Sequence, residues 1–125
     1  MPAPSPGVDV QSVTVLGSGT MGAGIAQVCS QAGYTTCLFD ADGLNLERGM
    51  KRVAYFWAKG VAKGKTTPQQ VEEWRQHLNP VTDLAAAMRG VDLVIEAVPE
   101  DLALKQRLFA DADKKAPKHA ILASN

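Results

Sequence analysis

The sequence predicts an α/β fold: a doubly wound parallel sheet of about five strands in the order 3-2-1-4-5, cut short at the end of the chain. Two observations predict it. Short apolar runs that are typical of strands alternate with segments whose apolar residues recur every three or four positions, as on one face of a helix. A cluster of glycines also lies where the first strand would turn into the first helix. Strands that alternate with helices are joined by right-handed crossovers and therefore lie parallel.

The first three elements are indicated by their composition and their ends. Residues 13–16 are mostly β-branched and end at a glycine, which predicts a strand. Apolar residues then recur at helical spacing over 21–32, and Gly33 stands where a helix commonly ends. The run 34–40 (YTTCLFD) predicts the second strand.

Two helices are expected next. Apolar residues keep a helical spacing from Leu46 to about Ala62, which predicts a long amphipathic helix. Thr67, Pro68 and Gln70 form the pattern of a capping box with proline at the first position. They begin a helix that is expected to run to about residue 78.

The second half of the chain continues the alternation. Residues 10–125 are expected to form one domain, preceded by a proline-rich flexible leader over residues 1–9. The run 91–98 is almost wholly apolar, which is typical of a strand covered on both faces. The other expected elements are a strand at 79–83, a helical turn at 84–88, a helix from 102 to about 116 capped by Asp101, and a fifth strand at 120–124.

Gly17, Gly19 and Gly22 form a G-x-G-x-x-G motif between the first strand and the first helix. Gly17 permits the tight turn, Gly19 lets the backbone approach a diphosphate, and Gly22 lets the helix pack closely on the sheet. We expect Gly24 to extend that contact. The free N–H groups and the positive dipole at the start of the helix favour an anion. By itself the motif also fits a tight strand–helix corner that binds nothing.

Asp40 strengthens the interpretation of the motif. It lies 18 residues after Gly22, at the expected carboxyl end of the second strand. A carboxylate there can accept hydrogen bonds from both hydroxyls of an adenosine ribose, and it would repel a 2′-phosphate. Because no arginine occurs in the next seven residues to bind such a phosphate, the pattern favours NAD over NADP. The alternative is a solvated carboxylate at a strand end.

The stretch 13–42 (VTVLGSGTMGAGIAQVCSQAGYTTCLFDAD) resembles the opening of the 3-hydroxyacyl-CoA dehydrogenase family, which includes 3-hydroxybutyryl-CoA dehydrogenases. The resemblance recurs at 91–113 (VDLVIEAVPEDLALKQRLFADAD) and at 121–125 (ILASN). It implies the NAD-binding, Rossmann-type domain of an oxidoreductase. That enzyme oxidises (S)-3-hydroxyacyl-CoA to 3-oxoacyl-CoA in fatty-acid oxidation or short-chain acyl-CoA metabolism.

The resemblance also implies which residues bind NAD. Met21 would touch the cofactor, Asp40 would hold the adenosine ribose, and the segment after the 91–98 strand would pass the nicotinamide half. Judged from the residues alone, Glu100 could equally be an ordinary first-turn acid, and Lys105 a solvated lysine. The complete expected set is Gly17, Gly19, Thr20, Met21, Gly22, Asp40, Val98, Pro99, Glu100, Lys105 and Asn125.

Other ionisable side chains carry weaker signals. Glu96 falls late in an apolar strand, so it must be paired or face the crevice. A structural hydrogen-bonding role and a ligand contact both stay open for it. His77 and His119 are expected at the surface, because neither has a carboxylate or hydroxyl neighbour at a catalytic spacing. No cluster of residues has metal-ligand spacing, so no metal is expected.

Composition limits the partners. Thirteen basic and thirteen acidic residues cancel, so a basic surface for nucleic acid is not expected. No apolar run approaches the length of a membrane span. Cys29 and Cys37 are expected to be buried free thiols, which fits a reducing cytoplasm or organelle matrix. Of these compartments we expect the cytoplasm.

The resemblance places the catalytic residues outside this sequence. The chain ends at Asn125, within a stretch that the family continues as A-S-N-T-S. A serine, a histidine that acts as general base, and the helical domain that forms the homodimer would follow. No catalytic residue is therefore expected within the 125 residues. General acid–base help is worth about 10²–10⁴-fold, so we expect cofactor binding with little or no turnover.

Two other functions stay open. One is a β-hydroxyacid dehydrogenase of another G-x-G-x-M-G family, against which the run 96–106 (EAVPEDLALKQ) argues. The other is a non-catalytic NAD-binding or structural module. The acyl-CoA substrate is the expected partner of the full-length enzyme. Lys59, Lys63 and Lys65 could meet its phosphates, although a solvated face is the favoured explanation for them.

Overall fold

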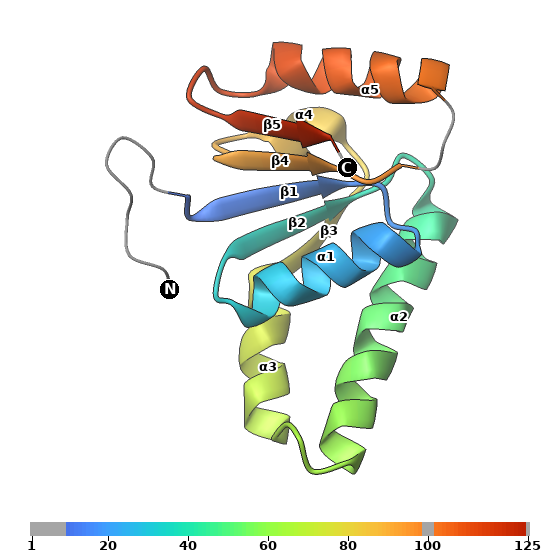
Figure 1. The fold of residues 1–125 in the computed structure, drawn as a ribbon, viewed down its shortest axis with the longest axis vertical. Helices are drawn as coiled ribbons and strands as arrows, with labels where there is room; N and C mark the ends of the chain where they lie inside the picture. Colours follow the sequence, from blue (N-terminus) through green and yellow to red (C-terminus); the bar gives the residue numbers. More distant parts are fainter. Residues whose placement is uncertain (1–9, 99–101, 125) are drawn as a thin grey trace.

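A five-stranded parallel sheet forms the centre of the protein, with the strand order β3-β2-β1-β4-β5. The computed structural model describes residues 10–98 and 102–124. Helices cover both faces of the sheet (Figure 1). The expected doubly wound fold and its strand order are therefore confirmed. The elements are β1 (Ser12–Leu16), α1 (Thr20–Gln31), β2 (Thr35–Phe39), α2 (Gly43–Ala62), α3 (Pro68–His77), β3 (Leu78–Val81), α4 (Leu84–Met88), β4 (Leu93–Glu96), α5 (Leu102–Lys115) and β5 (Ile121–Ser124).

Several element boundaries differ from the expected ones by one to three residues, including the third strand, which was expected at 79–83 and is Leu78–Val81. The helix expected from Leu46 begins at Gly43, because the Asp42 carboxylate accepts hydrogen bonds from the N–H groups of Leu44 and Asn45 at 2.9 and 3.3 Å. The strand within 91–98 is shorter than its apolar run and comprises only Leu93–Glu96. The expected leader over 1–9 and the Asp101 cap lie outside the described residues.

The sheet separates two apolar cores, because successive strand residues point to opposite faces. Val13, Val15 and Leu38 pack against the face covered by α1, α2 and α3. Leu16 and Phe39 belong to the other core, with α4 and α5. Within the described part of the chain, none of the helices is both long and apolar enough to span a bilayer.

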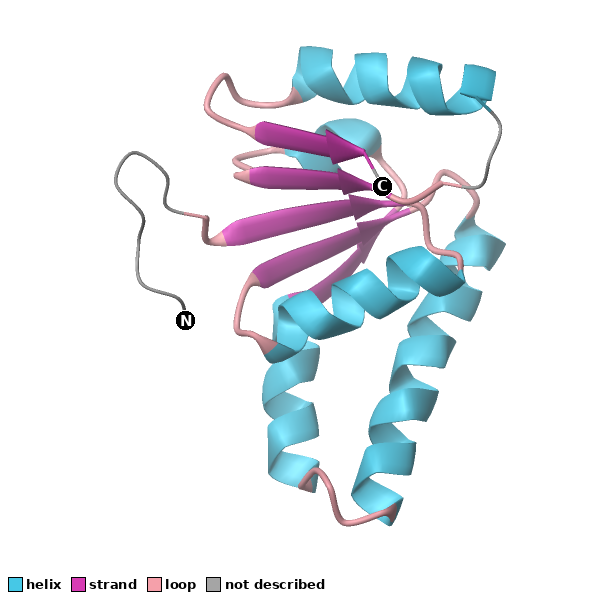
Figure 2. Ribbon diagram, viewed as in Figure 1, coloured by secondary structure: helices cyan, strands magenta, loops and turns pink. Residues whose placement is uncertain are grey.

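All five strands run in the same direction, so their carboxyl ends meet at one edge of the sheet. Val15 of β1 is paired with Leu38 of β2 and with Ile95 of β4, which puts the last residues of these three strands side by side. Figure 2 shows the strand arrowheads on the side where the turn into α1 and the beginning of α2 also lie. Polar groups from separate parts of the sequence gather at this edge.

Candidate functional site

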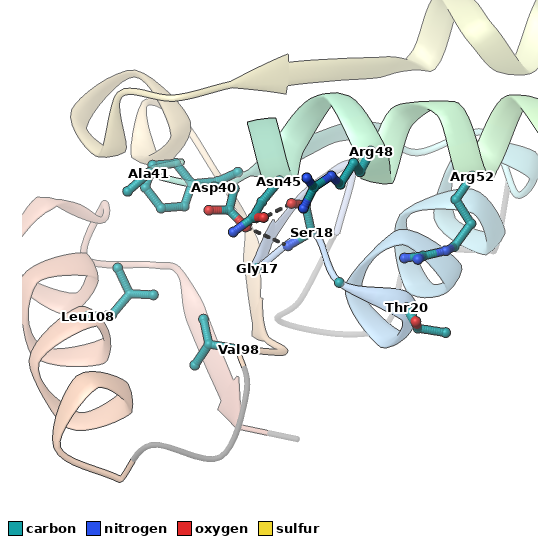
Figure 3. A pocket seen from close by; sticks show the side chains of 12 residues that line it. Gly17, Ser18, Thr20, Asp40, Ala41, Asn45, Arg48, Arg52, Val98 and Leu108 are labelled. Atoms are coloured by element: carbon teal, nitrogen blue, oxygen red, sulfur yellow. Dashed lines mark hydrogen bonds between the residues drawn. The ribbon is translucent and has the colours of Figure 1, made fainter. Parts of the chain in front are cut away.

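A cavity of about 490 Å³ opens beyond the carboxyl ends of β1, β2 and β4. Its walls come from the β1–α1 turn, the end of β2, the first turns of α2, the exit of β4 and one residue of α5 (Figure 3). A ligand site is expected at this edge of an open parallel sheet. The lining residues are Gly17, Ser18, Gly19, Thr20, Phe39, Asp40, Ala41, Asn45, Arg48, Arg52, Val98 and Leu108.

Two glycines of the G-x-G-x-x-G motif are required by close packing. Gly17 has a φ of +103°, and a Cβ there would lie 2.9 Å from the carbonyl oxygen of Ala97. A Cβ on Gly22 would collide with the carbonyl oxygen of Gly17. These contacts hold the turn into α1 against the exit of β4, so the motif shapes the cavity even where it does not line it.

Gly19 differs from its neighbours, because a Cβ on it would meet nothing within 4 Å. Gly19 lines the cavity and is the N-cap of α1, where no side chain caps the helix and no acidic residue lies in the first turn. The N-terminal end of α1 therefore faces the cavity without a negative charge from its own first turn. Gly24 does not extend the packing of the motif, and that expectation was wrong: a Cβ on Gly24 would also meet nothing within 4 Å.

Asp40 is held against the glycine turn by hydrogen bonds. Its Oδ2 accepts from the Ser18 hydroxyl at 2.8 Å and from the Ser18 N–H at 3.2 Å, while Oδ1 accepts from the Asp42 N–H at 2.9 Å. An ionised carboxylate has about four acceptor positions, so capacity for a further donor is left. Ser18 was not among the expected site residues, since it occupies a variable position of the motif.

The first turns of α2 form the wall opposite the glycine turn. A Cβ on Gly49 would lie 2.5 Å from the carbonyl oxygen of Ser18, so the helix backbone touches the turn directly. Arg48 and Arg52 lie on either side of Gly49 in the sequence, and both line the cavity. They lie 8 and 12 residues after Asp40, beyond the seven residues in which no arginine occurs. The sequence feature that could have indicated them is their four-residue spacing, which places both on one face of the helix next to a glycine.

Glu96 at the end of β4 is almost completely buried, with 1% exposure. Its Oε2 accepts a hydrogen bond from the Val98 N–H at 2.9 Å, and its Oε1 lies 3.6 Å from Lys105 Nζ. Glu96 is thus paired, as its burial requires. Lys105 lies against Glu96 with a side chain only 21% exposed, which rules out a simple solvated lysine.

The expected cofactor residues fall into three groups. Met21 is 58% exposed and, like Gly22 and Lys105, is not one of the described residues that line the cavity. Pro99, Glu100 and Asn125 lie outside the described residues. The structure brings the others together around the cavity: Gly17, Gly19, Thr20, Asp40 and Val98.

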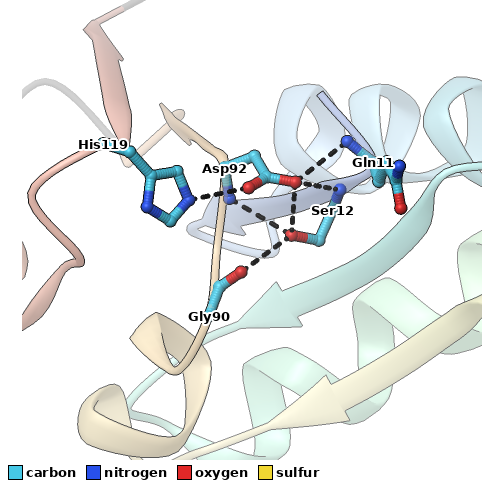
Figure 4. Close-up of polar contacts among 5 residues, drawn as sticks. All are labelled: Gln11, Ser12, Gly90, Asp92 and His119. Atoms are coloured by element: carbon cyan, nitrogen blue, oxygen red, sulfur yellow. Dashed lines mark hydrogen bonds and ion pairs between the residues drawn. The ribbon is translucent and has the colours of Figure 1, made fainter. Parts of the chain in front are cut away.

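A second polar cluster lies at the opposite, amino end of the sheet (Figure 4). His119 Nε2 lies 2.8 Å from Asp92 Oδ1, while Asp92 Oδ2 accepts hydrogen bonds from the Ser12 hydroxyl and the N–H groups of Gln11 and Ser12. Partial burial acts to raise the pKa of Asp92, but these hydrogen bonds outweigh it and hold the pKa below its ordinary value. His119 is 60% exposed, as a surface residue should be, yet it has a carboxylate neighbour that the sequence spacing did not indicate.

The remaining reactive side chains do not form a site. Cys29 and Cys37 are free thiols, as expected, but they are half-buried and not buried. His77 is partly exposed at the end of α3. Among the residues that the structure describes, no group of histidine, cysteine and acidic side chains could hold a metal ion.

Comparisons with known proteins agree with this geometry. The family model "3-hydroxyacyl-CoA dehydrogenase, NAD binding domain" matches residues 12–125. The 3-hydroxyadipyl-CoA dehydrogenase of Escherichia coli (strain K12) is 39% identical over 118 residues, which are 94% of this chain and 25% of that protein. The mitochondrial hydroxyacyl-coenzyme A dehydrogenase of Rattus norvegicus is 39% identical over 123 residues, covering 93% of this chain and 38% of that protein.

A solved structure shows the same likeness in three dimensions. The (S)-3-hydroxybutyryl-CoA dehydrogenase of Ralstonia eutropha superposes with a TM-score of 0.89 at 28% identity. The superposition covers 94% of this chain and 41% of that chain. This chain therefore spans well under two thirds of the length of each protein compared.

Proposed function

Since the chain belongs to the family of NAD-binding domains of 3-hydroxyacyl-CoA dehydrogenases, we propose that it supplies the cofactor site of an enzyme that oxidises (S)-3-hydroxyacyl-CoA to 3-oxoacyl-CoA. In such an enzyme NAD takes up the hydride from the substrate. The part left to this chain is to bind the dinucleotide, orient it and fix its position at the edge of the sheet.

One observation carries the proposal: the uncapped start of α1 and the carboxylate of Asp40 open into the same cavity. A helix start attracts a diphosphate through its unpaired N–H groups and its positive dipole. A carboxylate at the end of the neighbouring strand accepts hydrogen bonds from a ribose. These two groups, together with the open space over Gly19, suit the diphosphate and adenosine ribose of NAD.

Glu96 and Lys105 support a further part of the proposal. Their ion pair lies at the exit of β4, next to Val98 of the cavity wall. We propose that this pair holds the β4 exit in place for the nicotinamide half of the cofactor. Met21, Pro99, Glu100, Lys105 and Asn125 complete the proposed NAD-binding set on the strength of the family resemblance.

The catalytic base is proposed to come from outside these residues. The described lining residues include no histidine, and the one carboxylate among them, Asp40, is bonded to Ser18 and Asp42. Residues 10–125 then act as the cofactor domain, and a helical domain supplies the base and the homodimer contact. The acyl-CoA substrate and a cytoplasmic location are part of the same proposal.

Two experiments test the proposal. Isothermal titration of the chain is expected to show binding of NAD and weaker binding of NADP, because Asp40 would repel a 2′-phosphate. Absence of NAD binding would remove the proposed cofactor site. In a protein that contains this chain and a helical domain, oxidation of NADH is expected to depend on acetoacetyl-CoA. NAD-dependent oxidation of 3-hydroxyisobutyrate instead would favour another β-hydroxyacid dehydrogenase.

A further inference from the structure

Two arginines in the cavity have no part in the proposed cofactor contacts. Arg48 and Arg52 are four residues apart on α2, so they lie on the same face of the helix. Both line the cavity, and Figure 3 shows Arg48 near Ser18 and Arg52 directed toward Thr20 at the beginning of α1. Arg52 therefore faces the end of the cavity where the first N–H groups of α1 are found.

Packing fixes the position of the face of α2 that carries Arg48 and Arg52. Gly49 brings the backbone of α2 against Ser18, where a Cβ would lie 2.5 Å from the carbonyl oxygen. Val53 and Trp57 are buried beneath the helix, and the Trp57 indole N–H donates a hydrogen bond of 2.9 Å to Gln31 at the end of α1. Because α2 is tied to α1 at both ends of this contact, Arg52 has a defined place beside the turn.

The charge in the cavity is not balanced by the protein. Among the described residues, neither Arg48 nor Arg52 forms a salt bridge, whereas the neighbouring Lys51 pairs with Glu47 at 3.2 Å. Asp40 is the one acidic residue of the described wall, so the wall contains two positive charges and one negative charge. The surplus positive charge lies next to a helix start that also favours an anion.

We propose that Arg52 binds the diphosphate of NAD from the α2 side, facing the N–H groups of α1. The inference rests on the proposed NAD site and adds a residue to it. The motif supplies main-chain N–H groups and hydroxyls but no charged side chain, and a guanidinium adds charge-assisted hydrogen bonds that suit phosphate oxygens. Arg52 lies toward Thr20, so it meets the bridge between the two halves of the dinucleotide, which NAD and NADP share.

Arg52→Gln tests the proposal, with Lys51→Gln as the matched control. Lys51 is the adjacent cation, is exposed, and lies outside the described cavity wall. Isothermal titration is expected to show NAD and ADP binding about tenfold more weakly to Arg52→Gln, since a hydrogen bond to a charged group is lost. Lys51→Gln should bind both ligands as the unchanged chain does. High salt is expected to reduce the difference in affinity between Arg52→Gln and the unchanged chain, because it screens the attraction between the guanidinium and the diphosphate.

Several results would overturn the proposal. NAD binding by Arg52→Gln within a factor of two of the unchanged chain would do so, as would a loss confined to NADP, which would assign Arg52 to a 2′-phosphate. Arg52→Lys guards against a folding defect, because it keeps the charge and the stem and should recover most of the affinity. If Arg52→Lys binds NAD as weakly as Arg52→Gln does, the positive charge does not account for the binding, and the proposal is overturned. Failure of the unchanged chain to bind NAD or ADP would reject the proposed function as well.

Discussion

The Ser18 hydroxyl donates a hydrogen bond of 2.8 Å to Oδ2 of Asp40, and this bond joins the turn after β1 to the end of β2. The two residues are 22 positions apart in the sequence. Their contact determines which way the carboxylate faces, because Oδ2 is held by Ser18 and Oδ1 by the Asp42 N–H. Orientation of the acid therefore depends on the same turn that exposes the start of α1.

Replacing the acid tests its part in cofactor binding. Asp40→Ala is expected to weaken NAD binding by about 1–3 kcal/mol, since a charged hydrogen-bond acceptor is lost. Isothermal titration with NAD measures the change. Glu47→Ala is the control, because Glu47 is an exposed acid of α2 that pairs with Lys51 outside the described cavity wall. An Asp40→Ala chain that titrates normally would take the carboxylate out of the site.

A methyl group at Gly49 is expected to separate α2 from the glycine turn. Its Cβ would lie 2.5 Å from the Ser18 carbonyl oxygen, and this backbone atom cannot move aside unless the turn itself shifts. Gly49→Ala should lower the free energy of unfolding by about 1–3 kcal/mol, the usual cost of overpacking. It should also weaken NAD binding. Urea denaturation and NAD titration measure the two effects.

Gly24→Ala is the matched control for Gly49→Ala. Both are helical glycines, but a Cβ on Gly24 meets nothing within 4 Å. Alanine there is expected to raise stability by roughly 0.5–1 kcal/mol, because glycine has the greater conformational entropy to lose. If the two variants show the same change in the free energy of unfolding in urea, the contact between Gly49 and Ser18 is contradicted.

The Asp92 cluster predicts a dependence of stability on pH. Hydrogen bonds hold the pKa of Asp92 in the folded protein below its ordinary value. The stability it provides is therefore present above the unfolded carboxyl pKa of about 3.9 and lost as the pH falls through the folded value. Asp92→Ala should lower the free energy of unfolding at pH 7, and the difference from the unchanged chain should shrink below about pH 4. A difference that persists at low pH would mean that the carboxylate charge is not its cause.

Thiol chemistry provides a further test of packing. Burial raises the pKa of Cys37 to about 11, although a hydrogen bond with Thr14 acts in the opposite direction. Since the thiolate is the reactive form, iodoacetamide is expected to label native Cys37 very slowly at pH 7, and faster as the pH rises toward 11. Labelling followed by mass spectrometry measures the rate. Unfolding in urea should abolish the protection, and fast labelling of the native chain would contradict the burial.

The exposed edge of β5 is expected to cause self-association of the chain. In the described sheet β5 pairs only with β4, and Ile121 at its beginning is 44% exposed. Exposed edges favour pairing with another strand. Sedimentation of the 125-residue chain is expected to show a fraction of dimers that rises with protein concentration. Purely monomeric behaviour at millimolar concentration would remove this expectation.

Local patterns determined most of the fold. Apolar spacing and capping residues predicted the helices and strands, because these signals act over a few residues. The alternation of the two then predicted the parallel sheet and its order, which the structure confirms. Asp40 could be found in the same way, since the end of β2 lies at the same edge of the sheet as the glycine turn after β1.

Tertiary structure decided which side chains meet. The pairs Ser18 with Asp40 and Asp92 with His119 are 22 and 27 positions apart, and no spacing rule joins them. Arg48 and Arg52 line the cavity from a helix that lies directly on Ser18 at Gly49, a contact between segments distant in the sequence. A sequence records which residues can form a helix face, but the partner of that face is fixed by packing between elements that are distant along the chain.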